Sequence, residues 1–146
     1  QKDYEAAAKI FEEIHRDEPG NFFAANHLAL SLAELAPEKR TRAAQLAEVN
    51  ARQYPRASDA VATLGWVYMK LGRLDEAERA LQAATSGGQV SSDTAYYVAS
   101  VLKAREKPEQ ARDLLKNALA TEGPFVNRAD AQKLFDELAK AAEKKD

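Results

Sequence analysis

The sequence predicts an all-α fold of stacked helix pairs, an α-solenoid, and three observations support this prediction. Alanines recur at a step of 34 residues, at Ala43, Ala77 and Ala111. A fixed period of this length is the signature of a repeat architecture. No run of β-branched residues alternates with polar ones for long enough to predict a strand. The six glycines and five prolines fall mostly between the expected helices.

Residues 1–21 are predicted to contain one helix, the second helix of a truncated repeat. Its apolar residues are three or four apart, at Tyr4, Ala7, Phe11 and Ile14. No sequence with the pattern of a first helix precedes them. We therefore expect an excised fragment of a longer array, with self-association through the uncovered apolar side of residues 3–17.

Residues 22–57 are predicted to form the first complete repeat, which is longer than the others. Ala43 follows Ala7 by 36 residues instead of 34. We expect the two additional residues in the turn around 36–39, because turns absorb insertions at little cost. Asn50 stands where the later repeats have alanine.

Residues 58–91 form the clearest repeat. Its small and apolar residues are, in order, Leu64, Gly65, Tyr68, Gly72, Leu74, Ala77, Leu81 and Ala84. This spacing resembles the tetratricopeptide repeat, a helix-turn-helix of about 34 residues. Gly65 and Ala77 lack bulk, which allows the two helices to approach closely, and Gly72 stands where the first helix should end. A generic helical bundle is the alternative interpretation.

Residues 92–124 are the last repeat and keep the pattern of residues 58–91. Glu106 replaces the turn glycine, and Pro108 stands at the start of the second helix. Residues 125–146 are predicted to form a capping helix with a polar outer side. The resemblance implies one domain over residues 1–146, a right-handed α-solenoid of antiparallel helix pairs with about 3.5 repeats and a C-terminal cap.

Composition argues against most other functions. The formal net charge of −2 does not favour nucleic acid or an anionic membrane. Without cysteine there is no thiolate nucleophile, disulfide or cysteine-based metal site. The two histidines, His15 and His27, have no partners at a spacing typical of a metal site or a catalytic triad. No phosphate-binding glycine motif or segment of about 20 apolar residues occurs. We therefore expect no enzyme activity, cofactor, metal or membrane insertion, and a soluble piece that is cytoplasmic or periplasmic.

The resemblance implies a concave peptide-binding groove lined by the first helices. The matching residues are Phe23, Asn26, Leu30, Asp59, Ala62, Trp66, Met69, Asp93, Tyr96, Ser100 and Lys103. We expect Trp66 to be the centre of an exposed aromatic strip flanked by Leu30 and Tyr96. The alternative is that Trp66 fills space between adjacent first helices. The basic residues of the family's carboxylate clamp are missing, which favours an apolar, neutral or mildly basic peptide or helix.

By the same resemblance, the chain is expected to be a protein-interaction module or scaffold. The amino-acid sequence of residues 26–34 and 64–68 is similar to that of bacterial members of the family, which serve in envelope assembly, secretion or surface-polymer export. Two alternatives stay open. One is a self-assembling scaffold, and the other is an accessory domain of a larger enzyme.

Overall fold

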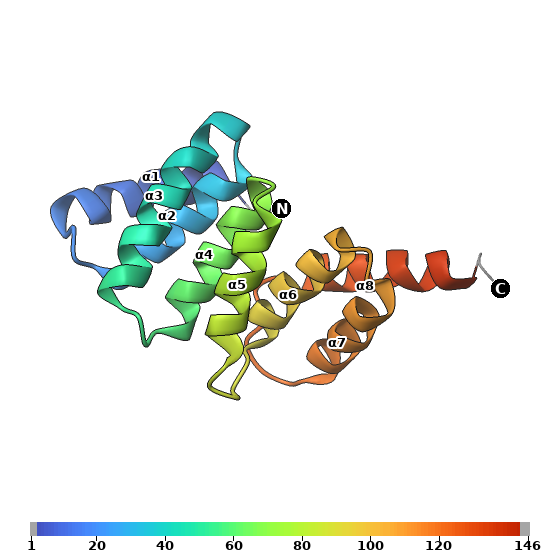
Figure 1. The fold of residues 1–146 in the computed structure, drawn as a ribbon. Helices are drawn as coiled ribbons and strands as arrows, with labels where there is room; N and C mark the ends of the chain where they lie inside the picture. Colours follow the sequence, from blue (N-terminus) through green and yellow to red (C-terminus); the bar gives the residue numbers. More distant parts are fainter. Residues whose placement is uncertain (1–2, 144–146) are drawn as a thin grey trace. The chain divides into compact units, whose positions relative to one another are not determined.

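The computed structural model describes residues 3–143, and every regular element in that range is a helix (Figure 1). The helices are α1 (Tyr4–Asp17), α2 (Phe22–Glu34), α3 (Pro37–Gln53), α4 (Ser58–Lys70), α5 (Leu74–Thr85), α6 (Ser92–Ala104), α7 (Pro108–Ala120) and α8 (Arg128–Glu143). The predicted all-α fold of helix pairs is confirmed. The chain divides into two compact units, Gln1–Ala84 (unit 1) and Thr85–Asp146 (unit 2), which are described separately.

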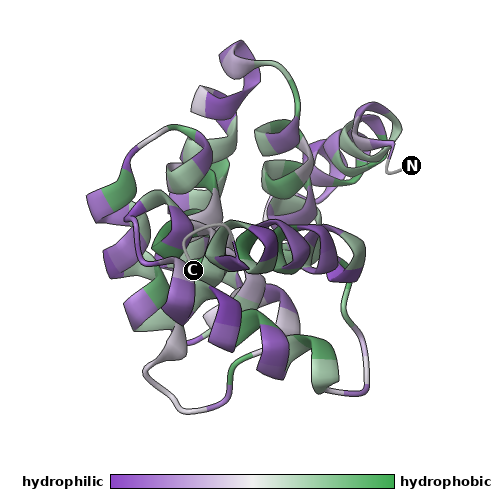
Figure 2. Ribbon diagram, turned by 90° about the vertical axis from the view of Figure 1, so that its right-hand side faces the viewer, coloured by the Kyte–Doolittle hydropathy of each residue, from purple (hydrophilic) through white to green (hydrophobic). Residues whose placement is uncertain are grey.

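Unit 1 is built around α2, which packs against α1, α3 and α4. Most of its core side chains are alanines, which let the helix backbones lie close together. The fully covered residues of this core include Leu28, Ala29, Ala33, Ala43 and Val67. Hydrophilic and hydrophobic residues alternate along single helices, as the mixture of purple and green in Figure 2 shows.

The two additional residues lie in the predicted stretch, around 36–39, but the prediction that this stretch is a turn is wrong, because α3 already begins at Pro37. Only Leu35 and Ala36 separate α2 from α3, so the turn is short. Ala43 is the seventh residue of α3, whereas Ala77 and Ala111 are the fourth residues of α5 and α7. The insertion therefore lengthens the start of a helix. Proline at the first helical position, preceded by a residue in extended backbone with φ −55° and ψ 150°, explains this early start.

The repeat substitution Asn50 is accommodated inside unit 1. The side chain is 2% exposed, and its Nδ2 donates to the carbonyl of Phe22 at 3.4 Å. A polar group buried this deeply requires a hydrogen-bond partner. Asn50 thus ties the end of α3 to the start of α2.

The first helices α4 and α6 end in the same hydrogen-bonded turn, although only one of them has glycine there. After α4, Gly72 N–H donates to Met69 and Arg73 N–H donates to Tyr68, both at 2.9 Å. After α6, Glu106 N–H donates to Lys103 at 3.0 Å and Lys107 N–H donates to Leu102 at 2.9 Å. This pair of bonds closes a helix with one left-handed residue. Accordingly, φ is +77° at Gly72 and +59° at Glu106.

Replacing Glu106 with Gly is expected to stabilise the protein by about 1 kcal/mol, because glycine adopts positive φ without the steric cost of a Cβ. The reciprocal variant, Gly72→Ala, should destabilise it by a similar amount, since a Cβ there has open space around it but the backbone is left-handed. Urea denaturation measures both. Equal stabilities of Glu106→Gly and the wild type would contradict the assigned turn.

Unit 2 packs α7 against α6 and α8, and α8 also contacts α6. Its core comprises Ala99, Ala111, Leu115, Ala131, Leu134 and Leu138. Asp93, near the start of α6, accepts hydrogen bonds from the backbone N–H groups of Val126 at 3.1 Å and Asn127 at 2.8 Å. These bonds fix the segment that leads into α8.

Candidate functional site

Trp66, expected to be an exposed anchor, is only 6% exposed. Its indole Nε1 donates to Glu34 Oε1 at 2.8 Å, and Lys70 Nζ lies 2.8 Å from Glu34 Oε2 and 5.3 Å from the centre of the indole ring. Glu34 is the last residue of α2, so the indole is held between two neighbouring first helices. The prediction of an exposed aromatic strip is therefore wrong at its centre. Space filling between first helices, the alternative interpretation, agrees with these contacts.

Two further residues of the predicted groove in unit 1 are buried. Asn26 is 8% exposed and Ala62 is 1% exposed. The reason for Asn26 is that α2 is surrounded by three helices and buries eight of its thirteen residues. Neither side chain offers appreciable surface to a ligand. The Oδ1 atom of Asn26 is buried and has no hydrogen-bond partner.

Phe23 is the most exposed aromatic residue of the predicted groove, at 68%. Asn21 caps α2 by accepting from the N–H of Ala24 at 3.0 Å, which sets Phe23 as the second residue of the helix. Its ring packs edge-on against the ring of Phe22, with 5.4 Å between the ring centres. Phe22 packs in the same way against Tyr54, with 5.2 Å between the ring centres. Phe23 is thus the outer member of a supported aromatic group.

The other predicted residues of unit 1 retain some surface. Asp59 is exposed, and Leu30 and Met69 are half-buried. Asp59 is the second residue of α4, the position that Phe23 has in α2. Two short connections reverse the chain twice between these helices, so both residues lie at the same end of unit 1.

The predicted residues of unit 2 are engaged with other parts of that unit. The carboxylate of Asp93 holds the backbone before α8, and Ser100 Oγ donates to the carbonyl of Tyr96 at 2.9 Å. Tyr96 is half-buried against the core. Lys103 pairs with Glu137 at 3.0 Å, and this hydrogen bond lowers the pKa of the Glu137 carboxyl. Asp93 and Lys103 therefore fasten α8 and the segment before it to α6, whereas the hydrogen bond of Ser100 stays within α6.

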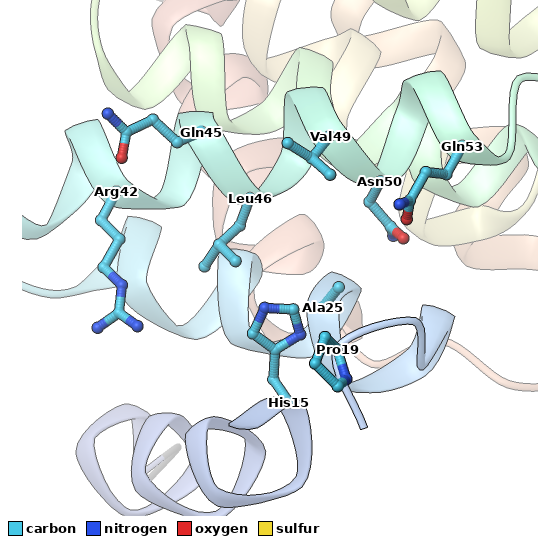
Figure 3. A pocket seen from close by; sticks show the side chains of 9 residues that line it. All are labelled: His15, Pro19, Ala25, Arg42, Gln45, Leu46, Val49, Asn50 and Gln53. Carbon is cyan, nitrogen blue, oxygen red and sulfur yellow. The ribbon is translucent and has the colours of Figure 1, made fainter. Parts of the chain in front are cut away.

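A hollow of about 220 Å³ lies between α1 and α3, on the second helices, where the sequence predicted no site (Figure 3). Its lining is His15, Pro19, Ala25, Arg42, Gln45, Leu46, Val49, Asn50 and Gln53. Arg42 is paired with Glu12 of α1, and the buried Nδ1 of His15 has no hydrogen-bond partner. The lining contains no Ser, Cys or Thr nucleophile and no Asp or Glu beside His15.

Among the described residues, the structure contains neither a metal-holding group nor a membrane-spanning helix. Within residues 3–143, no group of three or more His, Asp or Glu side chains is arranged to hold a metal ion. In the same range, the helices are too short or too polar to cross a bilayer.

Comparison with known proteins gives a family match over part of the chain and several matches to solved structures. The tetratricopeptide-repeat family matches residues 34–99, from the end of α2 into α6. Among solved structures, a crystal structure of MamA has a TM-score of 0.60 with 17% identity, covering 98% of this chain and 91% of that chain. MamA 41-end from Desulfovibrio magneticus RS-1 has a TM-score of 0.58 with 16% identity, covering 98% and 88%. MamA MSR-1 C2 has a TM-score of 0.58 with 17% identity, covering 98% of this chain and 89% of that chain. At these identities the likeness shows the fold alone. No curated protein matches the chain.

Proposed function

We propose that this chain is a tetratricopeptide-repeat protein and acts as a non-enzymatic scaffold that binds a peptide or helix on the first-helix face of unit 1. The observation that supports this most directly is the exposure of Phe23, 68%, on a helix that is otherwise largely buried. An aromatic side chain already held by neighbouring rings loses little conformational entropy when a ligand covers it. Such residues are the usual energetic centres of interfaces.

The surroundings of Phe23 favour a ligand with an apolar anchor and a neutral or basic neighbour. The exposed carboxylate of Asp59 lies at the same end of unit 1, and Leu30 and Met69 add half-buried apolar surface. The first-helix residues of the predicted groove in this unit include no lysine or arginine. A ligand whose terminal carboxylate needs a basic clamp would therefore bind poorly.

Phe23→Ala is expected to weaken binding of selected peptides at least tenfold, which corresponds to about 1.4 kcal/mol. The peptides would be selected from a display library on the wild-type chain, and their dissociation constants measured by calorimetry. Because Phe23 is mostly exposed, the stability should change by no more than about 0.5 kcal/mol.

The matched control is Val49→Ala, an exposed apolar residue on α3 that is 45% exposed. It should leave binding unchanged. If Val49→Ala weakens binding and Phe23→Ala does not, the ligand lies on the second helices and the proposed site is wrong.

The proposed cellular setting is bacterial envelope assembly, secretion or surface-polymer export, which the spelling of the repeats supports. A photo-crosslinking phenylalanine analogue at position 23 would capture the partner in the source cells. Capture of a component of one of these systems, lost when Asp59 is changed to Lys, supports the setting. Crosslinks confined to unrelated proteins contradict it.

A further inference from the structure

The hollow between α1 and α3 combines polar and apolar side chains in a small volume (Figure 3). Both helices pack against α2, whose buried residue Ala25 also lines the hollow. Figure 3 shows His15 of α1 and Leu46 of α3 pointing toward one another across it. Its volume, about 220 Å³, is below the range of about 300–1,000 Å³ that holds a drug-sized ligand, so it suits a single ring.

His15 contributes a polar atom that the fold does not use. Its Nδ1 is buried and has no hydrogen-bond partner, which costs free energy that a ligand hydrogen bond recovers. The turn of an imidazole about its Cβ–Cγ bond is soft, so this nitrogen can be brought to face a ligand in the hollow. In a neutral imidazole Nδ1 either donates or accepts. A hydroxyl does both and pairs with it in either tautomer, whereas a carbonyl or an amino group pairs in only one.

The charges of the lining disfavour an ionic ligand. Arg42 is already paired with Glu12 of α1. An anion would have to displace this carboxylate, and a cation would be repelled by the guanidinium. Apart from His15, the other polar side chains of the lining are carboxamides, which carry no charge, at Gln45, Asn50 and Gln53. The hollow therefore favours a neutral ligand.

The apolar part of the lining suits an aromatic ring. Leu46 is half-buried and Val49 is 45% exposed. The guanidinium of Arg42, which lines the same hollow, can stack on the face of a ring while it stays paired. We infer that the hollow binds a phenol, with the hydroxyl at His15 and the ring against Leu46 and Val49. The phenol is either the side chain of a tyrosine or a small free molecule.

Titration with p-cresol, followed by NMR of the imidazole groups, tests the inference. His15 and His27 are the only histidines in the sequence, so their signals are easily told apart from all others. The signals of His15 should shift and saturate. Those of His27, which stacks on Phe11 and does not line the hollow, should stay in place. Toluene should bind about fivefold more weakly, a ratio that corresponds to one hydrogen bond.

His15→Leu is the matched variant, because it keeps an apolar side chain and removes both ring nitrogens. Toluene and p-cresol should bind this variant equally, as measured from the methyl signals of Leu46 and Val49. Val49→Trp should fill the hollow and block both ligands. Since position 49 is exposed, urea denaturation of that variant should stay close to the wild type.

A blocked tyrosine, N-acetyl-tyrosine N-methylamide, distinguishes the two sources of the phenol. If a polypeptide supplies the ring, the blocked tyrosine should bind more tightly than p-cresol, because the exposed carboxamides of Gln45 and Gln53 can pair with its two amides. Weaker binding than that of p-cresol assigns the site to a small free phenol.

Other outcomes overturn the inference. Absence of a shift at His15, or equal binding of p-cresol and toluene to the wild type, shows that the hollow does not select a phenol. A preference for p-cresol that persists in His15→Leu shows that His15 does not recognise the hydroxyl. Tighter binding of p-toluate than of p-cresol shows that Arg42 captures an anion. Phe23→Ala should leave the binding of p-cresol unchanged, and a loss in that variant would show that this site and the one proposed at Phe23 are not separate.

Discussion

Trp66→Ala is expected to lower the free energy of unfolding by about 3–5 kcal/mol, the usual cost of truncating a buried large aromatic residue. The side chain is 6% exposed, so its removal leaves a cavity. It also leaves Glu34 without the indole N–H and Lys70 without the ring beneath its ammonium group. Urea denaturation followed by circular dichroism measures the loss.

Trp66→Phe is the matched control, because it keeps most of the ring and removes the N–H that Glu34 accepts. It should cost about 1–3 kcal/mol, the penalty for leaving a half-buried carboxylate short of one donor. Were Trp66→Ala to unfold at the wild-type urea concentration, the side chain would be exposed in solution and the original assignment as a groove anchor would return.

The burial of Trp66 could not be predicted from helical periodicity alone. Helical periodicity places it on the face opposite Leu64 and Tyr68, and this is the face of a first helix that borders either solvent or the next first helix. The pattern is identical in the two cases. The distinguishing contact, from Trp66 to Glu34, joins residues 32 apart and depends on how two repeats stack.

The turns were easier to predict than the contacts. Glycine at position 72 and its replacement at 106 mark helix ends through a local backbone requirement, and positive φ is found at both. Packing across repeats has no such local signal. The Tyr68 hydroxyl donates to Glu48 at 2.9 Å. Burial is the main cause that raises the pKa of Tyr68, and this hydrogen bond is the second. Nothing in the spacing of the two residues predicts their contact.

The residues of the candidate site also differ in how far the sequence could predict them. Phe23, which the sequence included for its position in the repeat, is 68% exposed, although Ala24 and Ala25 beside it in the first turn of α2 are buried. The roles of Asp93 and Lys103 in holding α8 could not be predicted, because both depend on the path of residues 125–137. The exposure of Ile14 in α1, 37%, was expected from the sequence, whereas that of Ile10, 57%, was not.

Gly65→Leu is expected to destabilise the protein by about 3 kcal/mol, the upper end of the usual range for overpacking. A Cβ at this position already lies 2.6 Å from Leu81 Cγ and 3.2 Å from the carbonyl oxygen of Ala77, so a larger side chain must push α4 and α5 apart. Gly20→Ala is the control, since a Cβ there meets nothing within 4 Å. Thermal and urea unfolding of both variants measure the difference.

The double variant Gly65→Leu with Leu81→Ala decides whether the contact itself is responsible. Moving the leucine from one helix to the other restores most of the volume between them, so the two changes together should cost less than their sum by more than about 1 kcal/mol. Additive costs would mean that the backbone freedom of glycine, and not its contact with Leu81, is what position 65 requires. In that case, close packing would not be the reason why the eighth residue of each first helix, Ala29, Gly65 or Ala99, is small.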